Sequence, residues 1–132
     1  MSKRKLWYVI APYSHTDKQI SLYRKKHQEL IIGKMASMGV YCLDPLANHY
    51  VVETLMINGG PSLPTDFAFW DGFCHRTIDA CDGGIVCNTI DGWQESRGVT
   101  AEMSHINSKN LPLLYVSDLN QMSTDQIREL MW

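Results

Sequence analysis

The sequence has no long hydrophobic run and no excess of charge of either sign. Its apolar stretches, such as Leu111 to Val116, are far shorter than the ~20 residues that a helix needs to cross a bilayer. Twelve Lys and Arg against fourteen Asp and Glu give a formal charge of -2. No basic groove for long nucleic acid is therefore predicted, and no membrane partner. A small-molecule ligand is the favoured partner.

A targeting signal and a cysteine framework are also missing. The basic start, Met1 to Lys5, leads into a short strand-like run that ends at a proline, without an apolar signal core or a small-residue cleavage site. The cysteines lack the close spacing of a disulfide-stapled mini-domain or a zinc knuckle. They are Cys42, Cys74, Cys81 and Cys87. We therefore expect a cytoplasmic protein with reduced thiols.

The histidines and cysteines form no recognisable metal or nucleophile motif. His15, His49, His75 and His105 are scattered and include no repeated i, i+4 pair. Cys74 and His75 are adjacent on one expected helix and point in different directions, so they are no nucleophile–base pair. No metal and no redox cofactor is expected.

What is present fits one small domain over residues 1–132. The chain has 132 residues, and 45% of them are hydrophobic, which is enough for one core. Short β-rich apolar runs predict strands over Leu6 to Ala11, Val40 to Leu43, Ile85 to Thr89 and Leu113 to Val116. Capping residues and apolar spacing predict helices over Thr16 to Gly39, Thr65 to Ala80, Gly98 to Lys109 and Asp125 to Met131.

The first helix and the segment after the second strand need separate comment. On the helix, apolar side chains expected to face inward recur every three or four residues: Ile20, Tyr23, His27, Leu30, Ile31, Met35 and Met38. The segment from Leu46 to Pro64 has no sustained period and includes the turn cluster Asn58 to Pro61. It is interpreted as a long loop with at most one helical turn near Val51 to Met56.

The alternation of strands and helices predicts the architecture. It is typical of an α/β fold, here a small doubly wound, flavodoxin-like or Rossmann-like parallel sheet of four to five strands with helices on both faces. In such sheets ligands bind where the carboxyl ends of the strands share an edge. The loops at Pro12 to Thr16, Pro45 to Tyr50 and Asp91 to Gly98 should therefore meet.

The most informative stretch runs from Gly92 to Glu102, from a strand end into a helix. Ser96 and Gly98 place a hydroxyl and backbone N–H groups at the helix N-terminus, which favours a phosphate or carboxylate. Glu102 leans back toward the same crevice, and the helix dipole is expected to keep it ionised. Such a carboxylate can attack a sugar carbon that bears a good leaving group. Alternatively, Ser96 only caps the helix and Glu102 is a solvated acid.

Four motifs, in order over roughly Leu6 to Tyr115, resemble the nucleoside 2-deoxyribosyltransferase-like superfamily. Residues Tyr8 to Ser14 are similar to its "YLAGPYS" strand, and Pro45 with His49 looks like its "P…H" loop. Cys81-Asp82 resembles the "CD" before its third strand. The stretch Gly92 to Glu102 resembles its "GW..S.G...E" signature, which is the most specific of the four.

This resemblance implies an activity and a homo-oligomer. The superfamily includes deoxyribosyltransferases, which move 2-deoxyribose between bases, and nucleotide N-glycosidases, which give the sugar to water. Its members commonly complete each site with a neighbouring subunit, so a homodimer or larger assembly is expected. The leading function is cleavage or transfer at the N-glycosidic bond of a nucleoside or nucleoside 5′-monophosphate. The alternative is a non-catalytic protein that binds a nucleotide or an ADP-ribose-like ligand on the same fold.

The resemblance also implies roles for individual residues. Glu102 matches the nucleophile that attacks C1′, and Ser96 matches a residue that contacts the 5′-phosphate. Trp93 is expected to form an apolar wall or to stack on the base. The remaining expected substrate contacts, with a pocket floor formed by the first three, are Tyr8, Ala11, Pro12, Tyr13, His49 and Gly98.

The sequence departs from the family pattern at the acid that assists the leaving base. The family places an aspartate about eight residues before the "CD" aspartate, where this chain has Cys74. Asp71, nearly one turn earlier on the same helix, is the expected catalytic substitute, and Asp79 is a poorer one. Ala11 replaces the glycine of "AGP". Two further contacts stay open: a phosphate contact by Arg24, and a hydrogen bond from His105 to Glu102.

Overall fold

Four strands form one parallel sheet in this computed structural model, which describes residues 3–61 and 67–132, without the side chains of 48–50 and 67–69. The strands are β1 (Leu6–Ile10), β2 (Tyr41–Leu43), β3 (Gly83–Val86) and β4 (Leu113–Tyr115). Their order across the sheet is β2-β1-β3-β4, and every pairing is parallel. The predicted small doubly wound α/β fold is confirmed.

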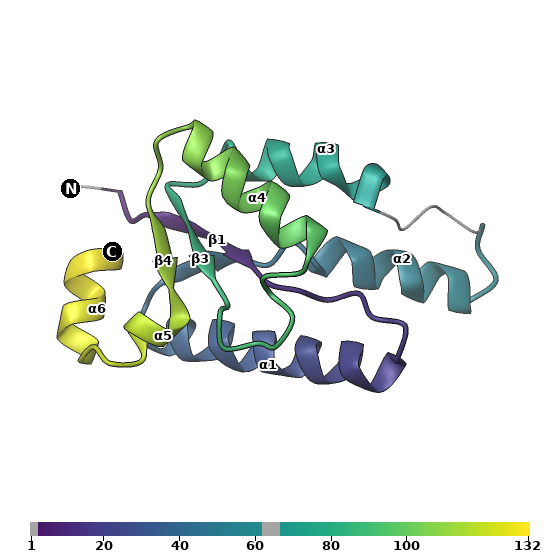
Figure 1. The fold of residues 1–132 in the computed structure, drawn as a ribbon, viewed down its shortest axis with the longest axis horizontal. Coiled ribbons are helices and arrows are strands. Elements are labelled where there is room, and N and C mark those ends of the chain that lie inside the picture. Colours follow the sequence, from purple (N-terminus) through teal and green to yellow (C-terminus); the bar gives the residue numbers. More distant parts are fainter. Residues whose placement is uncertain (1–2, 62–66) are drawn as a thin grey trace.

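Helices cover both faces of the sheet (Figure 1). They are α1 (Lys18–Ser37), α2 (Ala47–Ile57), α3 (Phe67–Ile78), α4 (Arg97–Ser108), α5 (Val116–Leu119) and α6 (Thr124–Met131). Helices α1, α5 and α6 pack on one face, and α3 and α4 pack on the other. In the described ranges, none of these helices has the length and the apolar composition needed to cross a membrane.

Strand β1 lies inside the sheet and contributes to both halves of the core. Its side chains alternate, so Trp7 and Val9 pack toward α1 whereas Tyr8 and Ile10 pack toward α3 and α4. The Trp7 indole N–H donates to the carbonyl of Met131 at 2.8 Å, which ties α6 to the sheet. Burying a large side chain of this kind contributes roughly 1.5–3 kcal/mol.

Helix α1 begins and ends close to the predicted residues, but its inward face differs. Asp17, not Thr16, is the N-cap, and its carboxylate accepts from the Gln19 N–H at 2.9 Å. The helix stops before Gly39, as predicted, and Gly39 has a φ of 78°. The fully buried stripe is Gln28, Ile31 and Met35. Three residues predicted to face inward are exposed because apolar residues occur around most of this helix: Ile20, Tyr23 and Leu30.

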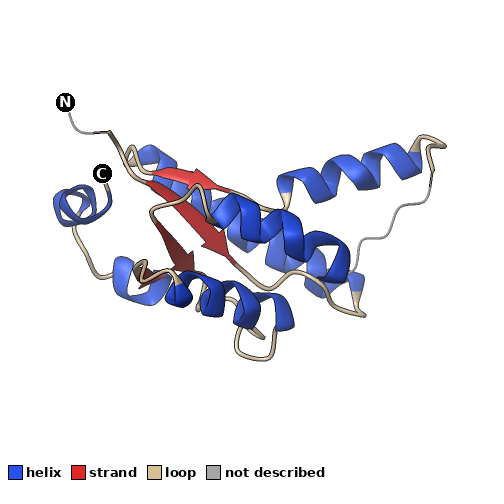
Figure 2. Ribbon diagram, turned by 90° about the horizontal axis from the view of Figure 1, so that it is seen from above, coloured by secondary structure: helices blue, strands red, loops and turns tan. Residues whose placement is uncertain are grey.

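The segment after β2 is the largest error of the sequence analysis. A long loop was expected from Leu46 to Pro64, but α2 occupies Ala47–Ile57. Figure 2 shows the helix before the grey segment standing away from the sheet. Its apolar side chains are exposed, as at Val51 and Ile57. A helix without a buried face has no 3.6-residue apolar period, so the pattern could not reveal it.

The remaining boundaries differ in smaller ways. Strand β3 covers Gly83–Val86, earlier than the predicted Ile85 to Thr89, because its parallel pairing with β1 begins at Gly83. The chain turns directly afterwards, where the Ile90 N–H donates to the Cys87 carbonyl. Helix α5 was not predicted, since its buried Val116 was assigned to the preceding strand. The predicted cap Thr65 lies outside the described residues.

We expect Gly83→Ala to destabilise the protein and Gly33→Ala to leave it as stable or slightly more so. A β-carbon on residue 83 would lie 2.6 Å from the Trp7 ring and 2.7 Å from the backbone oxygen of Pro112. Overpacking of this kind costs about 1–3 kcal/mol. Gly33 lies on α1 with open space around it. Alanine has the higher helix propensity, so the substitution there should raise the free energy of unfolding by up to about 1 kcal/mol. Urea unfolding followed by circular dichroism measures both, and equal stability of Gly83→Ala and wild type would contradict the packing.

Candidate functional site

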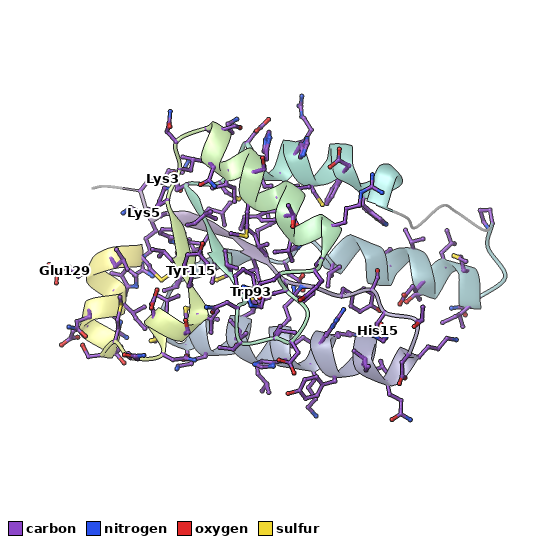
Figure 3. The ribbon with its side chains drawn as sticks, viewed as in Figure 1. Lys3, Lys5, His15, Trp93, Tyr115 and Glu129 are labelled. Atoms are coloured by element: carbon purple, nitrogen blue, oxygen red, sulfur yellow. The ribbon has the colours of Figure 1, made fainter. Side chains whose placement is uncertain are left out.

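A cavity of about 660 Å³ opens at the edge of the sheet where the strands end. Residues that follow β1, β2 and β3 line it, within the segments 11–15, 45–46 and 92–98. The expectation that these three loops meet is confirmed. In Figure 3, His15 of the first segment lies at the end of the molecule opposite Lys3 and Lys5, which precede β1. The volume is in the range of small-molecule sites.

The start of α4 forms one wall of the cavity. Ser96 is the N-cap, and its hydroxyl accepts from the Val99 N–H at 3.3 Å. Ser96 therefore caps the helix and lines the cavity as well. A β-carbon on Gly98 would lie 3.9 Å from the Ser96 Oγ and 4.0 Å from the Glu102 Oε1. Glycine at this position keeps open the space between the hydroxyl and the carboxyl group.

The Glu102 carboxyl group also lines the cavity, and it is largely desolvated. Its Oε2 is buried and has no hydrogen-bond partner among the described residues. Burial raises the pKa of Glu102 to about 8, the nearby charge of Asp71 raises it further, and the Tyr8 hydroxyl opposes both. The expectation that the helix dipole keeps Glu102 ionised at neutral pH is wrong, because the cost of desolvation exceeds the benefit of the dipole.

Tyr8 lies beneath Glu102 on β1 and is fully buried. Burial, followed by the charge of Glu102, raises the pKa of Tyr8 far above its ordinary value, so the phenol remains a neutral donor. Its hydroxyl interacts with the Glu102 carboxyl group and the Cys74 thiol, although neither contact has the geometry of a full hydrogen bond. Of the three residues expected to form the pocket floor, Ala11 lines the cavity, whereas Tyr8 and Pro12 are buried and are not among its lining residues.

Helix α3 supplies a second acidic wall. Trp70, Asp71 and Cys74 line the cavity, so the predicted catalytic residues Asp71 and Glu102 face the same space. Burial raises the pKa of the Cys74 thiol to about 11, and the thiol therefore stays protonated at neutral pH. Cys74 and the other three cysteines are free thiols.

Two groups considered near Glu102 point elsewhere. The His105 Nε2 lies 2.9 Å from the Asp79 Oδ1, so the hydrogen bond considered between His105 and Glu102 is not made. Lys109 also donates to Asp79. Because Asp79 is held by these two groups and does not line the cavity, Asp71 is the better placed of the two acids.

Helix α1 supplies a basic and polar wall that the sequence analysis identified only in part. Arg24 lines the cavity, and its Nη1 donates to the Ser14 carbonyl at 3.0 Å. Its guanidinium crosses Gly92, which has a φ of 90° and where a β-carbon would clash with it. Gln28, four residues later, donates to Asp44 at 2.9 Å, and its Oε1 has no partner among the described residues. The four-residue spacing of Arg24 and Gln28, which places both on one face of the helix, was the signal in the sequence that could have identified this wall.

The aromatic wall differs from the predicted one. Trp93 packs edge-on against Tyr115 with ring centroids 6.3 Å apart and is not among the lining residues (both residues are labelled in Figure 3). The indole that lines the cavity is Trp70 of α3, to which the sequence analysis gave no role in binding. Tyr13 lines it as expected, with its hydroxyl 3.5 Å from Glu53. The side chain of His49 lies outside the described residues.

The fold and this cavity define a small parallel α/β domain with a ligand-sized site at its strand ends. Residues 5–118 match the DUF1937 family, a domain of unknown function, and the chain belongs to that family. No curated protein matches the chain. Across residues 3–61 and 67–132, no three His, Cys, Asp or Glu side chains are grouped so that they could hold a metal ion.

We expect Glu102→Gln to change how stability depends on pH. The folded protein binds the Glu102 proton more tightly than the unfolded chain, because its pKa is about 8 instead of 4.5. This stabilisation is complete below the ordinary value and is lost as pH rises through the folded value. Glutamine stays neutral, so the variant should gain about 1 kcal/mol or more relative to wild type between about pH 5 and about pH 8.5.

Urea unfolding at both pH values measures this change. Glu95→Gln is the matched control, because Glu95 also lines the cavity but is exposed. Its difference from wild type should be the same at both pH values. A constant difference for Glu102→Gln as well would contradict a desolvated carboxyl group.

Proposed function

We propose that this protein cleaves the N-glycosidic bond of a nucleoside 5′-monophosphate or nucleoside, with Glu102 as the nucleophile. The observation that carries the proposal is the desolvated Glu102 carboxyl group facing the same space as the Ser96 hydroxyl at the start of α4. The motif resemblance between Gly92 and Glu102 supports the same chemistry. Transfer of the sugar to a second base, instead of water, is the same first half-reaction.

The distances in the cavity suit a sugar phosphate. The Ser96 Oγ and the Glu102 Oε1 lie 3.9 and 4.0 Å from the position that a β-carbon on Gly98 would take, so both atoms border the space that this glycine leaves open for a sugar phosphate. A phosphate at the α4 N-terminus would meet unpaired N–H groups and the positive end of the helix dipole. With the phosphate there, the anomeric carbon can approach Glu102, and the base can extend toward Trp70 and Asp71.

The proposed reaction begins when the Glu102 carboxyl group gives its proton to solvent water, before the substrate closes the cavity. The carboxylate attacks C1′, a bond forms between oxygen and carbon, and the electron pair of the C1′–N bond leaves with the base. The Tyr8 phenol lies where it can donate to the carboxylate and orient it. Water then attacks C1′ of the glycosyl ester and releases the sugar and the free carboxylate.

Arg24 favours an anionic substrate over a neutral nucleoside. Its guanidinium lines the cavity and forms no salt bridge with a carboxylate among the described residues. Its Nε is buried without a partner in the same part of the chain. A half-buried guanidinium that lacks an anion partner is suited to a phosphate, which accepts charge-assisted hydrogen bonds.

A second candidate function is ligand binding without cleavage. Two observations favour it: Glu102 is neutral near pH 7, which makes it a weak nucleophile, and Cys74 occupies the position where the resembled family has an acid. The same cavity would then hold a nucleotide or an ADP-ribose-like ligand. Both candidates use the anion-binding wall, so they differ only in whether base is released.

Glu102→Gln should abolish release of free base from deoxynucleoside and nucleoside 5′-monophosphates. Removal of a nucleophile lowers turnover by at least about a thousandfold. Chromatography of the bases released by wild type and variant measures this, and Glu95→Gln should keep wild-type turnover. If wild type binds nucleotides but releases no base, the second candidate function, binding without cleavage, is the correct one. Unchanged release by Glu102→Gln would remove Glu102 from the mechanism.

Arg24→Met should weaken the binding of nucleoside 5′-monophosphates and leave the binding of nucleosides unchanged. A hydrogen bond to a charged group contributes about 1.5–3 kcal/mol, so KM or Kd for the monophosphate should rise about 10- to 100-fold. Lys26→Met, an exposed cation on the same helix, is the matched control and should have no effect. Isothermal titration with paired nucleosides and monophosphates measures the difference. Equal losses for both ligands would argue against a phosphate contact.

A further inference from the structure

Two imidazole rings stack across the seam between α3 and α4, directly behind the acidic wall of the cavity. His75 of α3 and His105 of α4 have ring centroids 4.2 Å apart and an interplanar angle of 6°. Each ring has its own carboxylate. The His75 Nε2 lies 3.3 Å from the Asp71 Oδ1, and the His105 Nε2 lies 2.9 Å from the Asp79 Oδ1. These contacts thus form a chain of four side chains that begins at Asp71 in the cavity wall and ends at Asp79 on the surface.

The two carboxylates are not equivalent. Asp79 also accepts from Lys109, and hydrogen bonds from Lys109 and then His105 lower its pKa to about 2. Its charge is therefore compensated without a proton on His105. Asp71 has His75 as its ion-pair partner and no other among the described residues. A proton on the pair is accordingly best placed on His75.

Stacked imidazoles at this separation cannot both carry a charge without strong repulsion. Two such groups titrate as a pair, in two steps that belong to neither ring alone. The charged groups that face the pair are Asp71 from α3, Asp79 at the α3 end and Lys109 after α4. Beyond Asp71, the titratable neighbours are Cys74 and Glu102 in the cavity wall and the buried Tyr8 beneath Glu102. One shared proton would pair with the Asp71 carboxylate without placing two charges in the stack.

We propose that the His75–His105 pair holds this single proton for Asp71, and that Asp71 passes it to the departing base. The inference rests on the proposed function, because it names the group from which Asp71 regains the proton that the departing base takes. It gives Asp71 the role that the Cys74 side chain cannot fill. His75 is a positioning and proton-holding residue, since it acts on the substrate only through Asp71.

The proton balance of the step is closed. As the C1′–N bond breaks, its electron pair stays on the base nitrogen, which takes a proton from the Asp71 carboxyl group. Asp71 takes a proton at Oδ1 from the His75 imidazolium, which becomes neutral. When water attacks C1′ of the Glu102 ester, one water proton returns through Asp71 to His75, and Glu102 leaves as a carboxylate. The reaction consumes no proton and needs no other reactant.

Two variants separate this role from a purely structural one. His75→Gln keeps an N–H donor for Asp71 but cannot carry a proton. Turnover should fall by about 100-fold. The kcat profile of wild type should decline at alkaline pH, where the His75 imidazolium loses its proton, and this decline should be absent from the variant. His105→Gln keeps His75 and removes the ring that stacks on it. It should retain most of the turnover and keep the alkaline limb of the kcat profile, because the contact between His75 and Asp71 stays in place.

A proton NMR titration of the histidine ring signals tests the pair without reference to catalysis. In wild type, His75 and His105 should show linked transitions, and in His105→Gln the His75 signal should show a single transition. Independent transitions, unchanged by His105→Gln, overturn the one-proton pair. Urea unfolding of both variants checks that they fold.

The outcomes distinguish this inference from the proposed function. Wild type that releases no base from any nucleotide overturns the proposed function, and the proton relay with it. Base release by His75→Gln with the wild-type pH profile, at any overall rate, overturns the relay and leaves the proposed function standing.

Discussion

Withdrawal of the Glu102 carboxyl group from water is the constraint that gives the strand-end cavity its character. The helix that carries Glu102 begins at the edge of the sheet, so the side chain leans back over Tyr8 of β1 and beneath the space that Gly98 leaves open. Neither the Tyr8 hydroxyl nor the Glu102 Oε2 makes a full hydrogen bond among the described residues. A pair of buried polar groups left in this state costs folding free energy. A ligand that hydrogen-bonds to them would recover part of that cost.

The cavity is polarised across its width. The α1 wall presents the Arg24 guanidinium and the Gln28 amide, whereas the α3 and α4 walls present Asp71 and Glu102. The walls meet because all strands run in parallel, which brings the residues after β1, β2 and β3 to one edge. A ligand with an anionic end and a neutral polar end matches this arrangement, and a nucleotide has this form. The polarity thus follows from topology, with each wall belonging to a different helix.

The sequence could reveal features that depend on local order, but not those that depend on burial. Alternating strands and helices were sufficient for the fold, and the spacing of Ser96, Gly98 and Glu102 placed these residues on one helix start. Helix α2 was missed because none of its described side chains, at 47 and 51–57, is buried. The protonation of Glu102 could not be predicted, since desolvation arises from residues far apart in the chain. The position of Trp93 was wrong for the same reason, since its ring packs on Tyr115 from another element and Trp70 lines the cavity.

The contact between Arg24 and Gly92 has a consequence for the evolution of this family. The guanidinium occupies the space that any β-carbon at position 92 would need, and the positive φ there already disfavours other residues. A lineage that replaces Gly92 while Arg24 remains must displace the guanidinium from the cavity. The two positions are therefore expected to co-vary. Relatives that lack the arginine can replace the glycine, whereas relatives that keep the arginine should keep the glycine as well.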